Sequence, residues 1–399
     1  MKQGWEIKDF SDVCELVGGS QPSKDEFIYE PKDGYIRLIQ VRDYRTDKFV
    51  TYIPKEKARR FCETEDIMIG RYGPPIFGIF KGIEGAYNVA LMKAVVNEKI
   101  CNRDYFYLFL KTDKLREFVE HSSKRAAGQD GIRKELLDKY PVPLPPLPEQ
   151  QRIVVILDEA FAAIAKAKAN AQQNLQNAKE LFESYLQRVF ENKGEGWEEK
   201  SLGEILVKTE TVDPTKKPSE KFIYLDVSSV NKETKEIENA TVLMGKDAPS
   251  RARKLVRTND VIFATVRPTH SRVALITEEY DEQVCSTGYF VLRAKDFLNN
   301  NFVYYFLLTY SFNKQMEKLQ KGASYPAVTD AEVKGIVIPF PKLKKEQQTI
   351  VQKLDAINAE TKKLESIYQQ KINDLEELKK SVLQKAFAGE LKTDKVVAV

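Results

Sequence analysis

The feature that most constrains this chain is an internal duplication that spans nearly its whole length. Gly4-Trp5-Glu6 returns as Gly196-Trp197-Glu198, and Glu149-Gln150-Gln151 returns as Glu346-Gln347-Gln348. Because solenoid repeats are only about 20 to 50 residues long, each copy of this much longer repeat is expected to form a self-standing domain with its connector. Further matches occur in the same order: Pro22 and Lys24 with Pro214 and Lys216, residues 66–69 with 260–263, residues 105–110 with 303–308, and Leu157-Asp158 with Leu354-Asp355.

Length and composition agree with two soluble domains. The chain has 399 residues, and a single hydrophobic core stops growing at about 250 to 300 residues. With 42% hydrophobic and 31% charged residues and no apolar run of about 18 residues, a cytoplasmic protein with neither signal peptide nor membrane span is expected. The net charge of +4 is mild, so affinity for an anionic polymer would depend on where Lys and Arg cluster. The four cysteines include no Cys-x-x-Cys pair and are expected to be reduced core thiols.

The first part of each copy is expected to fold as a small mixed α/β (α+β) domain. Short runs of β-branched and aromatic residues, bounded by Gly, Pro and Asp, predict strands. A helix rich in Tyr, Phe and Leu follows in each copy, and it is expected to begin near Asn102 and near Asn301 because asparagine is a good N-cap. The predicted strands are residues 35–41, 66–69, 76–80 and 89–96 in the first copy and 222–227, 260–266, 273–277 and 289–293 in the second.

A proline-rich segment closes each domain, and a long helix is expected to follow it. Residues 141–148 contain five prolines, and Pro339-Phe340-Pro341 takes the same place in the second copy. Neither Pro nor Gly then occurs until Gly194 and Gly389, and Glu149 and Glu346 lie in the first turn, where the helix dipole favours acidic residues. The predicted organisation is a first domain (1–148), a first long helix (149–193), a second domain (194–345), a second long helix (346–391) and a C-terminal tail (392–399).

Both long helices carry the apolar seam of a coiled coil, with steps of three and four residues. For one such helix alone, the alternative is a helical hairpin inside an ordinary core. Two equal helices, each following an equal domain, favour antiparallel packing about a pseudo-twofold axis, which would hold the two domains apart. The seams are Ile153, Leu157, Ala160, Ile164, Ala167, Ala171, Leu175, Ala178, Phe182, Tyr185 and Val189 in the first helix and Ile350, Leu354, Ile357, Leu364, Tyr368, Ile372, Leu375, Val382 and Ala386 in the second.

Two separated, equivalent domains suit duplex DNA, because its local dyads present two half-sites on opposite strands. The motifs also carry a family resemblance. A Pro-rich segment leads into Glu149-Gln150 and again into Glu346-Gln347, and the second helix closes with Ala386-Phe387-Ala388-Gly389-Glu390-Leu391. From Gly4 to Leu391 the chain resembles the specificity subunit of type I restriction-modification systems. The segment before the second long helix departs from the family pattern, because residues 342–345 are Lys-Leu-Lys-Lys instead of a Pro-rich sequence. This difference affects only the expected start of the helix.

The resemblance implies a non-catalytic DNA-binding subunit with two target-recognition domains, each contacting one half of a bipartite site. It implies that the coiled coil sets the spacing of the half-sites and docks two methyltransferase (M) subunits, which modify adenine at N6 with S-adenosylmethionine. Restriction (R) subunits would join this core and use ATP and Mg. The chain itself is expected to hold no cofactor and no metal.

The motifs of the catalytic alternatives are missing from the sequence. The string closest to a methyltransferase tetrad, Gly73-Pro74-Pro75-Ile76, lacks both its polar and its aromatic residue, and Gly245-Lys246-Asp247 is a lone Gly-Lys rather than a Walker loop. Glu233-Thr234-Lys235 could mimic the end of a nuclease motif, but a solvated turn is the favoured interpretation. The two histidines, His121 and His270, lie in different domains, which excludes a shared dyad.

Loops with several hydrogen-bond donors are the candidates for DNA contact, because Arg can bind guanine edges and Asn or Gln can bind adenine. For each of them, an ordinary exposed polar loop is the alternative. In the first domain the candidates are Arg71, Tyr72, Asn88, Ser123, Lys124, Arg125 and Gln129. In the second domain they are Arg251, Arg253, Arg267, Thr269, His270, Arg272, Ser286, Thr287, Lys321, Ser324 and Tyr325.

A different class of function is also compatible with the sequence. In this alternative the helical rod is a scaffold that joins protein partners, and the domains bind peptides or proteins instead of DNA. Binding to duplex DNA should weaken steeply as salt rises, because each phosphate contact releases counterions. A self-sufficient methyltransferase or nuclease would show activity as an isolated chain, and we expect none.

Overall fold

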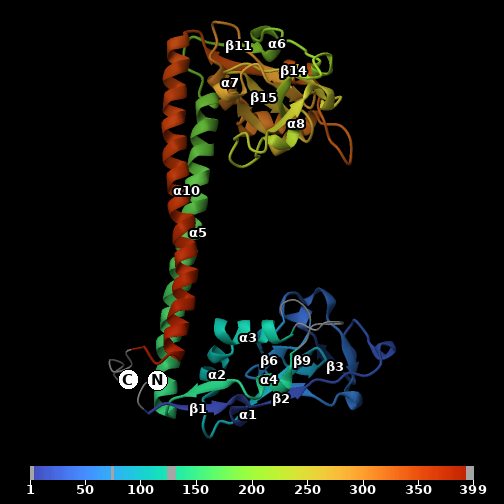
Figure 1. Cartoon of the computed structure of the whole chain (residues 1–399), viewed down its shortest axis with the longest axis vertical. Helices are drawn as coiled ribbons and strands as arrows, with labels where there is room; N and C mark the ends of the chain where they lie inside the picture. Colours follow the sequence, from blue (N-terminus) through green and yellow to red (C-terminus); the bar gives the residue numbers. More distant parts are fainter. Residues whose placement is uncertain (1–3, 73–75, 124–131, 392–399) are drawn as a thin grey trace. The chain divides into compact units, whose positions relative to one another are not determined.

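The computed structural model describes residues 4–72, 76–123 and 132–391 (Figure 1). The chain forms two compact units, of which the first comprises Met1–Ala171 with Gln370–Val399 and the second comprises Gln172–Gln369. Two long helices, α5 (Leu147–Glu191) and α10 (Lys344–Phe387), each contribute one part to each unit. In the described ranges no helix is long and apolar enough to cross a membrane. The predicted tail, residues 392–399, lies outside the described residues.

The first unit contains one two-stranded and two four-stranded sheets, whose strand orders are β1-β10, β2-β9-β6-β7 and β4-β3-β8-β5. Pairing is antiparallel except between β3 and β8. The strands are β1 (Glu6–Asp9), β2 (Cys14–Gly18), β3 (Tyr35–Ile39), β4 (Tyr52–Pro54), β5 (Phe61–Cys62), β6 (Ile67–Gly70), β7 (Ile79–Lys81), β8 (Gly85–Tyr87), β9 (Leu91–Val96) and β10 (Pro141–Leu144). The short helices are α1 (Phe10–Val13), α2 (Arg103–Phe109), α3 (Asp113–Ser123) and α4 (Lys134–Leu137).

The second unit repeats this arrangement, with strand orders β11-β19, β16-β15-β18 and β13-β12-β17-β14. Again one pair, β12 and β17, is parallel. The strands are β11 (Trp197–Ser201), β12 (Lys221–Leu225), β13 (Thr241–Met244), β14 (Ala252–Leu255), β15 (Val261–Ala264), β16 (Val273–Leu275), β17 (Val284–Ser286), β18 (Tyr289–Leu292) and β19 (Val337–Pro341). The helices are α6 (Leu202–Ile205), α7 (Asn300–Leu307), α8 (Tyr310–Leu319) and α9 (Asp330–Lys334).

The duplication seen in the sequence is therefore a duplication of topology. Strand β6 pairs antiparallel with β7 and β9, and β15 pairs in the same way with β16 and β18. The second unit has a single bridge, between Leu206 and Ala294, where the first unit has the full strand β2. The prediction of two similar mixed α/β domains with two long helices is confirmed.

Several predicted elements begin or end elsewhere. The strand predicted at residues 76–80 is β7, which starts only at Ile79, and the strand predicted at residues 66–69 is β6, which is shifted by one residue; the remaining predicted strands are shorter than expected. The prediction of Asn301 as an N-cap was wrong, because Asn299 caps α7 by accepting a hydrogen bond from the backbone N–H of Asn301. Asn102 is the cap of α2, as predicted, and its side chain accepts from the N–H of Tyr105.

The proline-rich segments are strands rather than free hinges. Strand β10 pairs with β1, and β19 pairs with β11, so each copy returns to its own N-terminal strand before the long helix starts. The helices begin at Leu147 and Lys344, earlier than Glu149 and Glu346. Pro148 is accommodated because the first turn of a helix needs no N–H from that residue.

The predicted seams of both long helices are confirmed, since none of their members is exposed. In the first unit the parts of α5 and α10 run antiparallel, and Lys168 Nζ lies 2.5 Å from Glu376 Oε1 (Figure 1). Lys379 in α10 also lies over the ring of Phe161 in α5, 5.1 Å from its centre. The second seam includes a buried polar residue, Thr361, whose hydroxyl donates to the carbonyl of Ile357 at 2.7 Å.

The C-terminal end of each long helix completes the core of the unit built by the other copy. In the second unit, Phe190 of α5 lies 5.0 Å from the ring of Phe302 and 5.6 Å from that of Phe306. In the first unit, Phe387 of α10 lies 4.9 Å from the ring of Tyr105 and packs against Phe109 at 5.6 Å. The closing motif around Phe387 is therefore explained by packing of apolar surface.

Candidate nucleic-acid interface

The loop after β15 has a constrained backbone at two positions. Arg267 and Ser271 adopt left-handed conformations, with φ of 51° and 47°. Between them, Pro268–His270 form a single turn of 3-10 helix. Left-handed conformations are costly for residues with a Cβ and persist only where surrounding contacts enforce them.

Contacts from three distant segments hold this loop. The N–H of Arg267 donates to the carbonyl of Pro326 at 2.7 Å. Asn313 on α8 donates through Nδ2 to Ser271 Oγ at 2.5 Å, and Lys235 donates through Nζ to the Ser271 carbonyl at 2.8 Å. Asn313 is not among the predicted contact residues, and Lys235 was expected to lie in a solvated turn, because nothing local in the sequence connects either residue to this loop.

Beside this loop, a cavity of about 610 Å³ brings together candidates from three segments of the second unit. Arg267 lies over the ring of Tyr325, with its guanidinium carbon 5.1 Å from the ring centre. Tyr325 is 72% exposed, so this stack lies at the surface. The cavity is lined by Arg251, Thr265, Val266, Thr287, Gly288, Tyr325 and Ala327.

The predicted cationic residues of the second unit differ in what their side chains already bind. Arg253 donates to the carbonyl of Ala252 at 2.8 Å and lies 3.5 Å from Asp213, while Arg272 donates to the carbonyl of Val230. Lys321 pairs with Glu332 at 2.9 Å. By contrast, Arg251 and Arg267 are exposed, and within the described ranges their guanidinium groups make no hydrogen bond or ion pair.

The uncharged candidates of the second unit fall into two groups. Ser286 is fully buried, and its hydroxyl accepts a hydrogen bond from the N–H of Gly288 at 3.2 Å. Thr287 and Ser324 are exposed, and Thr269 is half-buried. His270 is largely exposed. The loss of some surrounding water and the nearby cations, first among them Arg267, lower the pKa of its imidazole.

In the first unit, Arg71 follows β6 directly and lies over the ring of Tyr72, 4.9 Å from its centre. Asn88 is buried, and its Oδ1 accepts from the N–H of Ala90 at 3.1 Å. Ser123 is also buried and donates to the carbonyl of Glu120 at 2.9 Å. The candidates Lys124, Arg125 and Gln129, and the string Gly73-Pro74-Pro75, lie outside the described residues.

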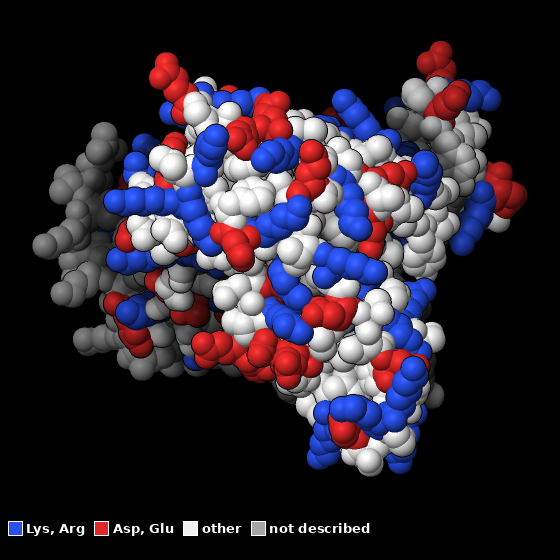
Figure 2. All heavy atoms as spheres, turned by 90° about the horizontal axis from the view of Figure 1, so that it is seen from above, with Lys and Arg blue, Asp and Glu red and all other residues white. Residues whose placement is uncertain are grey.

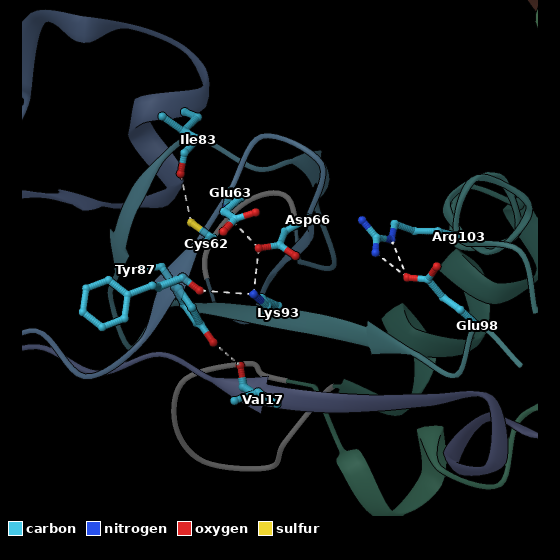
Figure 3. A network of polar contacts seen from close by, with 10 residues as sticks. Val17, Cys62, Glu63, Asp66, Ile83, Tyr87, Lys93, Glu98 and Arg103 are labelled. Carbon is cyan, nitrogen blue, oxygen red and sulfur yellow. Dashed lines mark hydrogen bonds and ion pairs between the residues drawn. The ribbon is translucent and has the colours of Figure 1, made fainter.

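Asp66 in the first unit and Asp260 in the second lie at equivalent places, in the turn before the central strand. The backbone N–H of Glu63 donates to Asp66 at 2.8 Å, and the backbone N–H of Arg257 donates to Asp260 at 2.9 Å, so each aspartate fixes its turn. Figure 3 shows Lys93 of β9 reaching Asp66, with Nζ and Oδ2 2.7 Å apart. Asp260 is 1% exposed and is instead held by Arg293 through two contacts of 2.7 Å. Both copies thus have an aspartate at this place, but its cationic partner is a lysine in the first unit and an arginine in the second.

On the face that Figure 2 shows, charge is spread rather than concentrated. Lys and Arg side chains are mixed there with Asp and Glu side chains, without a large area of one sign. The described residues contain no group of three or more His, Cys, Asp or Glu side chains placed to hold a metal ion. Contact of this face with an anionic polymer would therefore depend on individual cationic loops.

A duplicated unit with donor-rich loops beyond equivalent strands defines a class of two-domain recognition proteins. The family model described as the type I restriction modification DNA specificity domain matches residues 2–175 and again 194–377. The chain belongs to this family. The two matched ranges coincide with the two copies of the repeat, and the match to a DNA specificity family disfavours the scaffold alternative.

Known relatives and solved structures agree with this assignment. The chain is 24% identical to the type I restriction enzyme MjaVIII specificity subunit of Methanocaldococcus jannaschii, over 98% of this chain and 93% of that protein. It is also 24% identical to the EcoKI specificity subunit of Escherichia coli K12, over 98% and 90%. Its fold resembles the HsdS subunit of Thermoanaerobacter tengcongensis, with a TM-score of 0.64, 18% identity and 98% of each chain covered. A chain from a structure of a type I restriction-modification system gives a TM-score of 0.78 at 18% identity, with 98% and 99% covered.

Proposed function

We propose that this chain is the DNA-recognition subunit of a type I restriction-modification complex and that it has no catalytic residues of its own. Each unit contacts one half of a bipartite duplex target, and the paired helices set the spacing between the halves. One observation carries the proposal: apart from the missing equivalent of β2, the two units share one strand pairing, but the side chains beside the arginine beyond the central strand differ. Tyr72 follows Arg71 after β6, whereas Thr269 and His270 follow Arg267 after β15. Equivalent frameworks with different loop side chains suit two different half-sites.

The residues best supported as DNA contacts lie in the loops beside the cavity of the second unit. Arg251, Arg267, Thr287 and Ser324 are exposed and free to reach a groove, and His270 lies on the constrained loop. Arg253, Arg272 and Lys321 are occupied by contacts inside the protein, so phosphate contact would require them to exchange partners. DNA contact by the buried Asn88, Ser123 and Ser286 stays a prediction, and each of them now has a local hydrogen-bonding role.

The catalytic steps belong to partner subunits in this proposal. M subunits, two per complex, methylate adenine at N6 with S-adenosylmethionine, and R subunits cleave DNA with ATP and Mg. The long helices are the proposed docking surface for the M subunits. Exposed apolar side chains along them support a protein partner, because water would otherwise face these groups: Val155, Leu181, Ile367 and Leu378.

Mapping methylated adenines in the genomes of cells with and without this gene tests the proposal. The expected result is one bipartite motif that disappears with the gene, with two half-sites and a constant gap. The purified chain with its M subunits should bind that duplex with an affinity that falls steeply as salt rises. If the complex shows no preference among duplex sequences, the proposal is wrong, and protein binding by an otherwise DNA-indifferent chain would support the scaffold alternative. Methylation or cleavage by the isolated chain would contradict the non-catalytic assignment.

A further inference from the structure

We infer that each unit recognises a guanine through one arginine stacked on a tyrosine, Arg71 on Tyr72 in the first unit and Arg267 on Tyr325 in the second. This inference rests on the proposed function and adds the base and the residue that selects it in each half-site.

The two arginine–tyrosine contacts have similar distances although the repeat does not align them. The guanidinium carbon lies 4.9 Å from the Tyr72 ring centre in one unit and 5.1 Å from the Tyr325 ring centre in the other. Both arginines lie beyond the end of the central strand, β6 or β15. In the first unit the tyrosine is the next residue, whereas in the second it comes from a distant segment. The same pairing is thus built from different positions in two diverged copies.

The backbone of each arginine is tied to its unit. The N–H of Arg71 donates to the carbonyl of Ala90 at 2.8 Å, and the N–H of Arg267 donates to the carbonyl of Pro326 at 2.7 Å. The second arginine is constrained further by its left-handed conformation. A tied backbone and a stacked side chain reduce the conformational entropy lost on binding, which favours a residue that must meet a base in one orientation.

The donors of both arginines are unoccupied by described residues; Arg267 is exposed, and Arg71 is half-buried. Within the described residues, neither guanidinium makes a hydrogen bond or an ion pair, in contrast to Arg272, which donates to a carbonyl. Stacking on a ring uses the face of the guanidinium and leaves its N–H edge free. Two parallel N–H groups match the O6 and N7 acceptors that guanine presents in the major groove. Lysine can also contact these acceptors, but it is a flexible point charge without the planar fork of donors, so it selects guanine less sharply.

The test compares Arg267→Lys and Arg71→Lys by methylation mapping, using the whole complex of this chain with its M subunits. Lysine keeps the charge for a phosphate contact but loses the paired donors. Arg267→Lys should relax one guanine position in one half-site, with discrimination falling by roughly 5- to 150-fold, and leave the other half-site unchanged. Arg71→Lys should do the same in the other half-site only. Tyr325→Leu should relax the same position as Arg267→Lys, to a smaller extent.

Matched controls are Arg257→Lys and Arg116→Lys, because these arginines form ion pairs with Glu210 and Asp113; neither control should change the motif. A uniform loss of affinity for all sequences, with a shallower salt dependence, would overturn the inference and assign the arginines to phosphates. A wild-type motif without guanine in one half-site would overturn it for that unit. Both outcomes leave the proposed function intact, which fails only if the wild-type complex shows no sequence preference.

Discussion

Gln150 and Asn102 are joined by a hydrogen bond of 2.7 Å, in which the backbone N–H of Asn102 donates to Gln150 Oε1. The amide nitrogen of Gln150 donates to the carbonyls of Ile100 at 3.0 Å and of Pro145 at 2.7 Å. Gln150 is fully buried. One side chain therefore fastens the start of α5 to the turn that caps α2 and to the end of β10.

Gln347 makes the same three contacts in the second unit. Its Oε1 accepts from the N–H of Asn299 at 2.8 Å, and its Nε2 donates to the carbonyls of Phe297 at 3.1 Å and of Pro341 at 2.8 Å. The Glu-Gln motif that marks both copies in the sequence is thus explained by its buried glutamine. The glutamine fixes the origin of each long helix relative to the strands of its own unit.

Gln150→Leu should lower the free energy of unfolding of the first unit by about 3 kcal/mol, because one N–H and two carbonyls are left buried without their partner. Gln347→Leu should have the same effect on the second unit. Hydrogen exchange in α2 and in α7, measured at increasing denaturant concentrations, reports the loss of unfolding free energy of each unit separately. Gln151→Leu is the matched control, since Gln151 is exposed and its replacement should change stability by less than about 0.5 kcal/mol. Equal effects of Gln150→Leu and Gln151→Leu would contradict the assigned role.

Phe190→Ala should destabilise the second unit although Phe190 belongs to the helix that follows the first domain. Phe190 is 4% exposed and packs on Phe302 and Phe306, so a cavity costing about 3 to 5 kcal/mol is expected. Hydrogen exchange should become faster in α7 and stay unchanged in α2. Leu181→Ala on the same helix, at a site 58% exposed, is the control and should leave both helices protected. Faster exchange in α2 alone would show that Phe190 supports the other unit.

Asp260→Ala should destabilise the second unit by about 3 kcal/mol, because it removes the buried partner of Arg293 and leaves only the exposed Glu210, 2.9 Å away, to pair with the guanidinium. Arg293 is held by two contacts of 2.7 Å, and this pairing raises the pKa of its guanidinium. The comparison is Asp47→Ala, which removes an ion pair to Arg37 from an aspartate 80% exposed; a change of about 0 to 1 kcal/mol is expected there. Urea denaturation of both variants measures the difference, and similar losses would refute the buried role of Asp260.

Lys235 should make stability depend on pH above pH 8. Burial lowers the pKa of its ammonium from 10.5 to about 8, so between these values the unfolded chain binds more protons than the folded chain. Stability from this group therefore rises as pH increases from 8 to 10.5. Relative to Lys235→Met, the wild-type chain should gain about 1 to 2 kcal/mol over this interval, after allowance for partial solvation.

Urea denaturation at pH 7.5, 9 and 10 measures this gain. Loss of the hydrogen bond to Ser271 in Lys235→Met adds an offset that is the same at each pH, so the slope is the informative quantity. Lys232→Met provides the control, because Lys232 is exposed. Parallel pH profiles for wild type and Lys235→Met would disprove the prediction.

Architecture was accessible from the sequence because it depends on patterns that repeat along the chain. The duplication, the seams of α5 and α10 and the Glu-Gln motif follow from composition and periodicity, and the structure confirms the two similar mixed domains. The Asn102 cap was also predicted, since capping is a local interaction. The cap at Asn299 was missed because three consecutive asparagines, residues 299–301, satisfy the same local rule, and the turn geometry selects among them.

Tertiary structure alone decided which side chains of the candidate loops are free. It buried Asn88, Ser123 and Ser286, occupied Arg253 and Arg272, and placed Tyr325 under Arg267. It also brought Lys235 and Asn313 to the carbonyl and hydroxyl of Ser271. Burial and pairing of these side chains depend on which distant segments come into contact in the fold, and no local sequence pattern specifies those contacts. The duplicated architecture and the family resemblance therefore follow from repeated sequence patterns, whereas packing between distant segments selects the arginines and tyrosines that we propose as base contacts.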